Sequence, residues 1–287
     1  MTAESAQIFL TEQLSPRYGA GEAKAIARIV FEDAFDRGRA FDVARFEEIR
    51  SRLMTGEPVQ YVLDEANFFG LKFKVNPAVL IPRQETEELV AWVLEHLRTS
   101  ATELPALLDI GLGSGCIGIT LKKKFPALQL FGLEKSPAAL AVALENAARI
   151  LRLELSNPRI PESPNPQFAR GDILNRGDWT QFPSLDVVVS NPPYIPQEEK
   201  NLVPEHVSAY EPALALFVDD SDPLLFYRVV ADFSLEKLRP NGVLFFECNE
   251  FNASEVAHLL QEKGFGNVEL RKDLSGAERM VKAKLKH

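Results

Sequence analysis

The spacing of apolar residues divides this chain into a helical first part and a longer second part in which strands and helices alternate. Within roughly the first 60 residues, apolar side chains recur near helical spacing and no strand-like run is found. The pattern predicts helices over residues 3–14, 21–38 and 44–56, with Gly19 and Gly21 between the first two. We interpret this part as a small helical bundle, with a module that binds a partner as the alternative.

A pair of edge strands is predicted where the pattern changes, near residue 66. Two short runs, 66–70 and 71–77, are aromatic and alternate between apolar and polar, which indicates a β-hairpin. Pro82 ends the extended backbone that follows, and Thr86 is expected to open a helix that continues to residue 97.

From residue 104 onward, apolar runs of strand length alternate with helical segments. Strands are expected at 104–110, 128–134, 186–191 and 242–248, and helices at 116–125 and 137–151. This alternation is typical of a parallel sheet with helices on both faces. The last two runs, 265–273 and 278–287, are strand-like with almost no helix between them, so they must pair antiparallel. The expected fold is α/β, with a mostly parallel sheet that ends in an antiparallel edge.

The bulk composition is that of a soluble globular protein, with 46% apolar and 25% charged residues among 287. No apolar run approaches the roughly 18 residues that span a bilayer, and the N-terminus lacks the features of a signal peptide, so a cytoplasmic location is expected. Cys116 and Cys248 lie in separate apolar runs and the four His residues are scattered, which predicts no metal site. Residues 156–167, rich in Pro, Asn and Ser, are predicted to be a surface loop.

The net charge of −9 restricts the class of partner. Proteins that bind nucleic acids usually carry a basic excess or stripe, so a phosphate backbone is disfavoured as the main partner. A basic protein partner is compatible with this charge.

A glycine-rich loop, with Gly111, Gly113 and Gly115, lies between an apolar strand and a helix. Glycine permits a sharp turn and lets a ligand lie against bare backbone, and the amides at the helix start can bind a polar ligand group. The loop also fits the dinucleotide pattern G-x-G-x-x-G when Gly118 is counted, with Glu134 about 20 residues further on. The glycines alone therefore leave two ligand classes open.

Three acidic residues narrow the choice of ligand. Asp109, just ahead of the loop, would repel a dianionic pyrophosphate but suits a zwitterionic ligand that carries an ammonium group and a sulfonium. Glu134 ends the second strand, where it can accept both ribose hydroxyl protons; the structural alternative is a charge at a helix N-terminus. Asp172, after the presumed third strand, is either an acceptor for the adenine edge or an ordinary turn aspartate.

The run Asn191-Pro192-Pro193-Tyr194 is the most specific feature of the chain. It follows a buried strand that ends at Ser190, which places it at the carboxyl edge where α/β sheets bind ligands. A proline-rich turn that simply closes the strand is the structural alternative.

The chemistry of a planar NH2 group explains these residue types. An amide nitrogen is a poor nucleophile, so it must be held about 3 Å from an activated methyl group. The Asn191 side-chain oxygen and the Pro192 carbonyl can each accept one N–H, which orients the nitrogen and stabilises the positive charge that develops on it. Proline suits the site because it fixes φ and has no N–H. Tyr194 can stack on the flat amide face.

Taken together, the motifs resemble the class I methyltransferases, which have a Rossmann-like fold, and among them the release factor glutamine methyltransferase family. The resemblance runs through nearly the whole chain, in the order typical of the family. It includes the segments 56–63, 80–89, 109–115, 190–196, 210–216 and 272–281. Such enzymes methylate the glutamine of the Gly-Gly-Gln tripeptide in peptide chain release factors.

The resemblance implies S-adenosylmethionine as cofactor and assigns roles to individual residues. The expected cofactor-binding residues are Asp109, Gly111, Leu112, Gly113, Ser114, Gly115, Glu134, Asp172, Ile173 and Asn191. The expected substrate-binding residues are Asn191, Pro192, Pro193, Tyr194 and Arg83, of which Asn191, Pro192 and Tyr194 are the catalytic candidates.

The resemblance also implies a domain organisation. Residues 1–64 are expected to form a helical substrate-recognition domain, 65–84 a β-hairpin linker, and 85–287 the methyltransferase domain. The expected protein is a monomer that acts on release factors and binds neither a membrane nor nucleic acid directly.

Three alternatives remain open at this point. A sister family that acts on a ribosomal-protein glutamine shares Asn-Pro-Pro-Tyr, although the pattern Pro-Arg-x-x-Thr-Glu favours the release factor branch. An adenine-N6 DNA methyltransferase would also present an exocyclic amine to this motif, but it needs base flipping and a basic groove. A nucleotide-binding protein without transfer chemistry, such as an NAD sensor, is the third.

Overall fold

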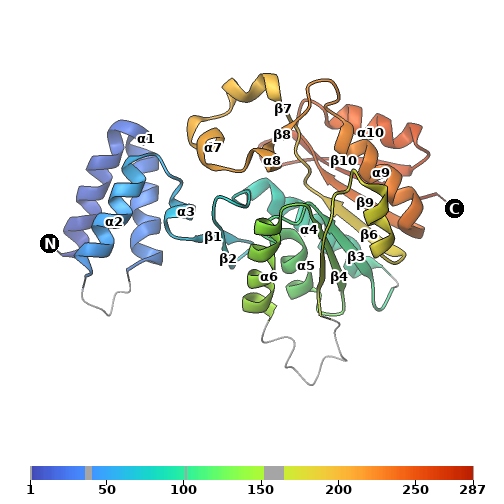
Figure 1. Ribbon diagram of the computed structural model, residues 1–287, viewed down its shortest axis with the longest axis horizontal. Helices are drawn as coiled ribbons and strands as arrows, with labels where there is room; N and C mark the ends of the chain where they lie inside the picture. The colour runs from blue at the N-terminus through green and yellow to red at the C-terminus, as the bar shows by residue number, and fades with distance from the viewer. Residues whose placement is uncertain (1, 36–40, 101, 152–164, 287) are drawn as a thin grey trace.

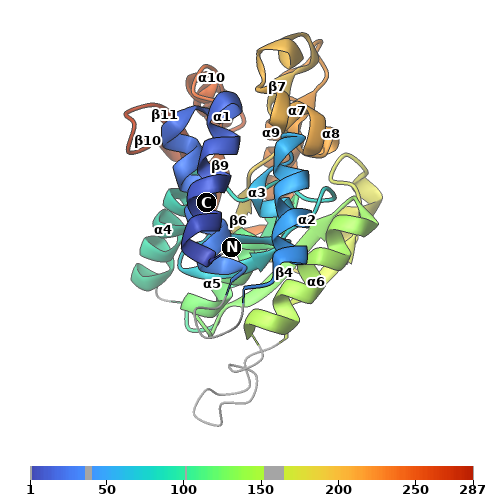
Figure 2. The same cartoon turned by 90° about the vertical axis from the view of Figure 1, so that its left-hand side faces the viewer.

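The computed structural model describes residues 2–35, 41–100, 102–151 and 165–286. A helical N-terminal part, a short hairpin and a larger part built on a sheet follow one another along the longest axis of the molecule (Figure 1). Seen from its N-terminal end, α1 and α2 lie side by side in front of the sheet (Figure 2).

The N-terminal part consists of α1 (Ala3–Asp33), α2 (Val43–Met54) and the short α3 (Val59–Val62). Helix α1 bends at Gly19, whose φ of 77° is one that glycine adopts without steric cost. The two helices predicted over 3–14 and 21–38 are therefore joined at this bend without a loop; the second ends at Asp33, and residues 36–38 of the prediction lie outside the described residues. Buried side chains of all three helices share one apolar cluster, which includes Leu10, Leu14, Ile26, Val30, Phe46, Leu53 and Val62.

The predicted hairpin is confirmed: β1 (Glu65–Phe68) pairs antiparallel with β2 (Leu71–Lys74). Helix α4 (Gln84–Thr99) follows, and it begins at Gln84 rather than at Thr86 as predicted. The start is earlier because Arg83 is the last extended residue after Pro82, and the helix dipole stabilises the acidic side chains of the first turn.

A seven-stranded sheet with the order β10-β11-β9-β6-β3-β4-β5 forms the centre of the larger part. The bounds are β3 (Ala106–Ile110), β4 (Gln129–Glu134), β5 (Gln167–Arg170), β6 (Leu185–Ser190), β9 (Leu238–Glu247), β10 (Gly266–Lys272) and β11 (Glu278–Lys284). Strands β5, β4, β3, β6 and β9 run parallel to one another, whereas β11 is antiparallel to both of its neighbours, β9 and β10. The predicted antiparallel end of the sheet is confirmed, and β11 is inserted between β9 and the edge strand β10.

The two faces of the sheet bury separate apolar layers. Leu107 and Val187 face helices α4, α5 (Cys116–Lys124) and α6 (Pro137–Leu151). Their chain neighbours Leu108 and Val188 face α9 (Leu225–Lys237), α10 (Ala253–Glu262) and the 3-10 helix η1 (Arg176–Gln181). This alternation accounts for the continuous apolar runs in the sequence, since strands covered on both faces need apolar residues at every position.

A segment in which the sequence pattern predicted no helix or strand lies above the carboxyl ends of the strands (Figure 1). It comprises β7 (Ile195–Pro196), η2 (Gln197–Leu202), α7 (Glu205–Tyr210), α8 (Ala213–Leu216) and β8 (Phe217–Val218). Strands β7 and β8 pair with each other in a small parallel sheet of their own. We call this segment, residues 195–218, the cap.

Two sequence expectations concern the remaining segments. The loop predicted at 156–167 lies mostly outside the described residues, and its last position, Gln167, begins β5. Among the helices that the structure describes, none is long and apolar enough to cross a membrane.

Candidate active site

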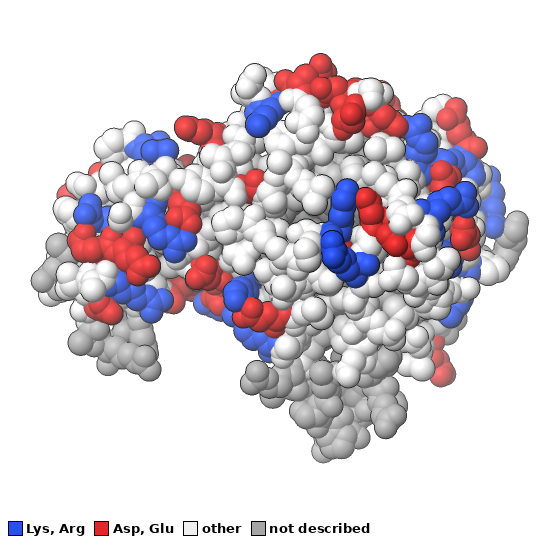
Figure 3. Space-filling model, viewed as in Figure 1, with Lys and Arg blue, Asp and Glu red and all other residues white. Residues whose placement is uncertain are grey.

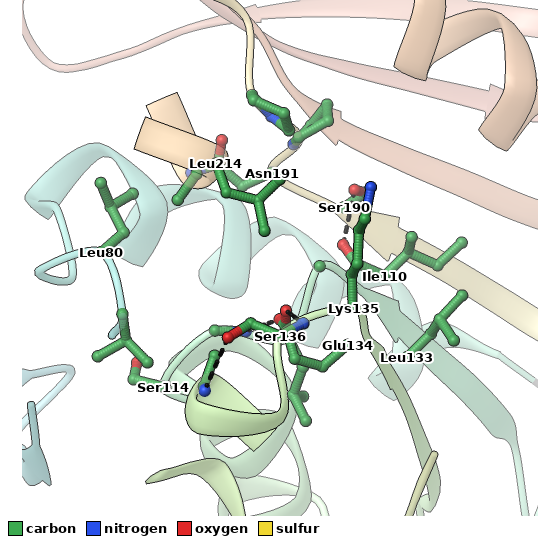
Figure 4. A pocket seen from close by; sticks show the side chains of 18 of the residues that line it. Leu80, Ile110, Ser114, Leu133, Glu134, Lys135, Ser136, Ser190, Asn191 and Leu214 are labelled. Carbon is green, nitrogen blue, oxygen red and sulfur yellow. Dashed lines mark hydrogen bonds between the residues drawn. The ribbon is translucent and has the colours of Figure 1, made fainter. Parts of the chain in front are cut away.

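A cavity of about 290 Å³ opens at the carboxyl ends of β3, β4 and β6. Its lining comes from the glycine-rich loop, the ends of β4 and β6, the start of α4, and the cap. Figure 4 shows Leu80, Leu133, Glu134, Asn191 and Leu214 placed around this space from different elements. The site therefore combines segments that lie far apart in the sequence.

The glycine-rich loop lies on the cavity wall, with Gly111, Leu112, Gly113 and Ser114 among the lining residues. Its three glycines have positive φ between 56° and 79°, which other residues adopt only with strain. At Gly115 a Cβ atom would also lie 2.5 Å from the Ile119 side chain. Gly115 itself supports the loop and does not line the cavity, although the sequence grouped it with the cofactor contacts.

Glu134, at the end of β4, is hydrogen-bonded to the glycine-rich loop. One carboxylate oxygen accepts a hydrogen bond from the Gly113 N–H at 2.9 Å, and the other accepts from the Ser136 N–H at 2.8 Å. The side chain is buried yet lines the cavity. Because each carboxylate oxygen has a further lone pair, Glu134 can still accept hydrogen bonds from two hydroxyl groups of a ligand.

Asp109 lies beneath the loop and does not line the cavity. Its Oδ2 accepts a hydrogen bond from the Gly118 N–H at 2.9 Å, in the first turn of α5, whereas Oδ1 has no partner among the described residues. Burial raises the pKa of this carboxyl to about 7, and the nearby charge of Glu134 contributes to the increase. Because Asp109 lies beneath the loop, its charged form would be stabilised by a ligand that places a positive charge on the cavity side of the loop.

Asp172 and Ile173 form another part of the wall, after β5. Asp172 pairs with Lys135 at 2.9 Å and accepts a hydrogen bond from the Leu174 N–H at 3.0 Å. It is thus a turn aspartate that also lines the cavity, so the two alternatives for this residue are both compatible with its position. Ile173 is buried and offers an aliphatic surface.

The Asn-Pro-Pro-Tyr run begins where β6 ends. The Ser190 hydroxyl donates to the Ile110 carbonyl at 2.8 Å and fastens this strand end to β3. Asn191, Pro192 and Pro193 line the cavity, but Tyr194 does not, because its ring packs against the apolar layer under α9 and α10. Burial raises the pKa of the Tyr194 hydroxyl above its usual range.

The Asn191 side chain is connected to a buried carboxyl group. Its amide nitrogen donates to the Thr86 hydroxyl at 3.4 Å, and that hydroxyl donates to Glu247 Oε2 at 2.6 Å. Burial raises the pKa of Glu247 to about 7, and the hydrogen bonds from Thr86 and Asn191 act in the opposite direction. Since the amide nitrogen is directed at these acceptors, the Asn191 side-chain oxygen can accept a hydrogen bond from a ligand.

Arg83 connects the start of α4 to the cap. Its guanidinium lies 2.6 Å from Glu211 Oε1, and Glu211 Oε2 accepts from the Ile81 N–H at 3.0 Å. Arg83 also lines the cavity, next to Pro212 and Leu214 of the cap. The residue expected to contact substrate is therefore engaged in holding the cap over the cavity.

The donor set fits S-adenosylmethionine better than a dinucleotide. Glu134 can accept hydrogen bonds from two ribose hydroxyls, and the buried carboxyl group of Asp109, beneath the loop, would favour a nearby positive charge. A pyrophosphate next to these two carboxyl groups would be repelled. The fit favours a zwitterionic ligand.

Thr86, Glu247 and Glu211 support the site but are not among the residues expected from the sequence. A weak signal exists for Glu247, because a charged residue ends an otherwise apolar strand. Thr86 lies in the Pro-Arg-x-x-Thr-Glu pattern and Glu211 in the segment 210–216, but neither pattern indicates their contacts, because their partners are distant in the sequence.

Comparisons with known proteins agree with this arrangement. Residues 83–209 match the family described as "Methyltransferase small domain". A solved methyltransferase from Pyrococcus furiosus, 15% identical, covers 83% of this chain and 98% of its own with a TM-score of 0.50, which concerns the fold alone.

Two curated relatives are similar in sequence over most of the chain. A release factor glutamine methyltransferase from Flavobacterium psychrophilum is 41% identical over 239 residues, which cover 83% of this chain and 79% of the relative. A protein of the same name from Bacteroides thetaiotaomicron is 34% identical over 96% of this chain and 97% of its own. At this identity and coverage, the chain belongs to the release factor glutamine methyltransferase family.

Proposed function

We propose that this protein transfers a methyl group from S-adenosylmethionine to the side-chain nitrogen of the glutamine in the Gly-Gly-Gln tripeptide of peptide chain release factors. The observation that carries the proposal is Asn191, which lines the cavity beside the glycine-rich loop with its amide nitrogen directed at Thr86. The names of the relatives at 34% and 41% identity support the same activity.

The cofactor half of the cavity is assigned to the wall between Gly111 and Ser114, together with Glu134, Asp172 and Ile173. Glu134 would accept the two ribose hydroxyls, and the aliphatic Ile173 would face the adenine with Asp172 at its polar edge. Asp109 would act through its charge, since it lies beneath the loop. Bound S-adenosylmethionine supplies a methyl group on a positively charged sulfur.

The substrate half is assigned to Asn191 and Pro192. The Asn191 oxygen and the Pro192 carbonyl would each accept one N–H of the glutamine NH2 and so direct the nitrogen lone pair at the methyl carbon. These oxygens would stabilise the positive charge that develops on the glutamine nitrogen as it accepts the methyl group, and one proton of that nitrogen would then pass to water. For Tyr194, which does not line the cavity, the proposal is stacking on the amide face once substrate has entered.

The domain boundaries are proposed on the same basis. Residues 1–64 would recognise the substrate protein, 65–84 would link, and 85–287 would carry out the transfer. The helical cluster around Leu10 and Phe46 and the separate layers of the sheet support this division.

The charge distribution supports a protein rather than a nucleic-acid substrate. Acidic side chains gather at the top of the molecule in Figure 3, and the exposed acidic residues of the cap and of the two positions that follow it include Glu198, Asp219 and Asp220. Such a rim repels a phosphate backbone and suits a basic protein surface. We propose a monomeric, cytoplasmic enzyme that has no direct contact with nucleic acid.

A comparison of acceptors with labelled cofactor tests this proposal. The purified protein is incubated with methyl-labelled S-adenosylmethionine and, in parallel, with a release factor, a ribosomal protein and duplex DNA. We expect label on the release factor, and none when its Gly-Gly-Gln glutamine is replaced by glutamate. Label on the ribosomal protein or the DNA alone would refute the substrate assignment, and tight binding of NAD instead of the cofactor would refute the activity.

A further inference from the structure

Thr86 and Glu247 form a buried contact that the methyl transfer described above does not use. Thr86 is 3% exposed and Glu247 1%, and they belong to different elements, α4 and β9. The Thr86 hydroxyl donates to Glu247 Oε2 at 2.6 Å. Thr86 lines the cavity, but Glu247 does not. Glu247 therefore has no direct access to a ligand there.

The direction of this hydrogen bond determines what Thr86 offers to Asn191. A hydroxyl has one proton, and here that proton is directed at Glu247, so toward Asn191 the Thr86 oxygen can only accept. The Asn191 nitrogen is the matching donor, at 3.4 Å, and Glu247 itself interacts favourably with the same nitrogen. If the Asn191 amide turned over, its oxygen would face an acceptor and a carboxyl group.

We propose that Thr86 and Glu247 are positioning residues that fix the orientation of the Asn191 amide, so that its oxygen faces the substrate NH2. The inference rests on the proposed function, because only an acceptor at this position can hold an N–H of the glutamine. A reversed Asn191 amide would present N–H groups to N–H groups, and the substrate would lose one of its two acceptors.

The surroundings of Glu247 argue that the contact serves more than the attachment of α4 to the sheet. A buried carboxyl group is costly, and an apolar side chain would pack there more cheaply. The charged and titratable groups around it are Glu85 of α4, Cys116 of α5, Arg279 of β11, Tyr194, Tyr227 of α9 and Cys248. The Arg279 guanidinium pairs with Asp273 and Glu250.

Substitution of Thr86 separates positioning from packing. Thr86→Val keeps the shape and removes the hydroxyl, whereas Thr86→Ser keeps the hydroxyl; Thr99→Val, near the end of the same helix, is the matched control. We expect Thr86→Val to lower kcat about 10- to 100-fold, as for loss of a hydrogen bond to a charged group, with cofactor affinity within about twofold. Thr86→Ser should recover most of the kcat. If Thr86→Val does not fold, Glu247→Gln is tested in its place. We expect kcat to fall about tenfold, because the Thr86 hydroxyl is then free to donate either to the new glutamine or to Asn191.

A double-mutant cycle shows whether Thr86 acts through Asn191. In an Asn191→Ala background, Thr86→Val should cause almost no further loss of kcat, whereas a purely structural role predicts that the two losses multiply. If Thr86→Val leaves kcat unchanged, or if the losses of kcat in the two single variants multiply in the double variant, the positioning role is refuted while the proposed function stands. No label on the release factor with the unmodified protein would overturn the proposed function and this inference with it.

Discussion

Asp109 and Glu247 are two buried carboxyl groups near the cavity, and burial raises the pKa of each to about 7. They differ in how their oxygens are used. Glu247 accepts from Thr86, whereas Asp109 Oδ1 has no partner within the part of the chain that the structure describes. A ligand cation near Asp109 would stabilise its charged form, so its titration should affect ligand binding.

Cofactor affinity is therefore expected to depend on pH through Asp109. A bound ammonium group lowers the pKa of this carboxyl below its free value of about 7, so binding favours the ionised form and becomes tighter as pH rises. Between about pH 6 and pH 7.5, cofactor affinity should rise roughly eightfold at most. This range lies below the one in which a free α-amino group, such as that of the cofactor, titrates. Calorimetric titration with S-adenosylmethionine at several pH values measures this rise in affinity.

Asp109→Asn is the control for this pH effect. Its amide cannot titrate, so affinity should be weaker and nearly constant over the same range. An equal slope in the variant would assign the effect to another group, and a flat profile in the unmodified protein would contradict the placement of a cation near Asp109.

At the scale of elements, the cap is fastened to the rest of the molecule by few polar contacts. Glu211, whose side chain is 1% exposed, makes two of these contacts, one with the Arg83 guanidinium and one with the Ile81 N–H. Removing one partner of a buried pair leaves the other charge without compensation, which costs about 3–5 kcal/mol if the structure does not relax. The cap can relax by opening, and Glu211 then reaches water.

Arg83→Met is expected to loosen the cap. Amide hydrogen exchange over residues 205–216 in the free protein should become at least about tenfold faster, which corresponds to ~1.4 kcal/mol of local stability. KM for the release factor should rise. Arg98→Met, near the other end of α4, should leave exchange in the cap unchanged. Unchanged exchange in Arg83→Met would show that this ion pair does not hold the cap.

The elements that local sequence patterns specify were predictable, and those that depend on distant contacts were not. Apolar runs such as 186–191 predicted buried strands, and the glycines with Asn191 identified the carboxyl edge, because α/β sheets bind ligands there. The cap has only short elements and was not foreseen. The contact between Thr86 and Glu247 was also not predictable, because it spans 161 positions and nothing local reports such a pairing.

For the molecule as a whole, the helical N-terminal part contacts the rest at more than one point. Lys72 of the hairpin pairs with Asp33 of α1 at 2.9 Å. The Tyr210 hydroxyl, in the cap, lies 3.2 Å from both the carbonyl and the hydroxyl oxygen of Thr55. The cap thus contacts both the cavity and the part that is proposed to recognise the substrate protein.

Tyr210→Phe should therefore affect large and small substrates differently. Loss of the hydrogen bond to Thr55 is expected to raise KM for an intact release factor about two- to tenfold, while kcat/KM for a short peptide with Gly-Gly-Gln stays constant. Tyr18→Phe is the matched control, because that hydroxyl bonds to the Leu53 carbonyl within the N-terminal helices themselves. Equal effects on protein and peptide would assign Tyr210 to the cavity instead.

Side-by-side determination of turnover and cofactor affinity in Asn191→Ala tests most directly whether Asn191 holds the substrate nitrogen. Single-turnover methylation of a release factor and calorimetric titration with S-adenosylmethionine provide the two values. We expect turnover to fall by roughly 10²- to 10³-fold, as for removal of one oriented hydrogen-bond partner, while cofactor affinity changes less than about twofold. Equal losses of turnover and cofactor affinity, or turnover that does not change, would contradict this role of Asn191.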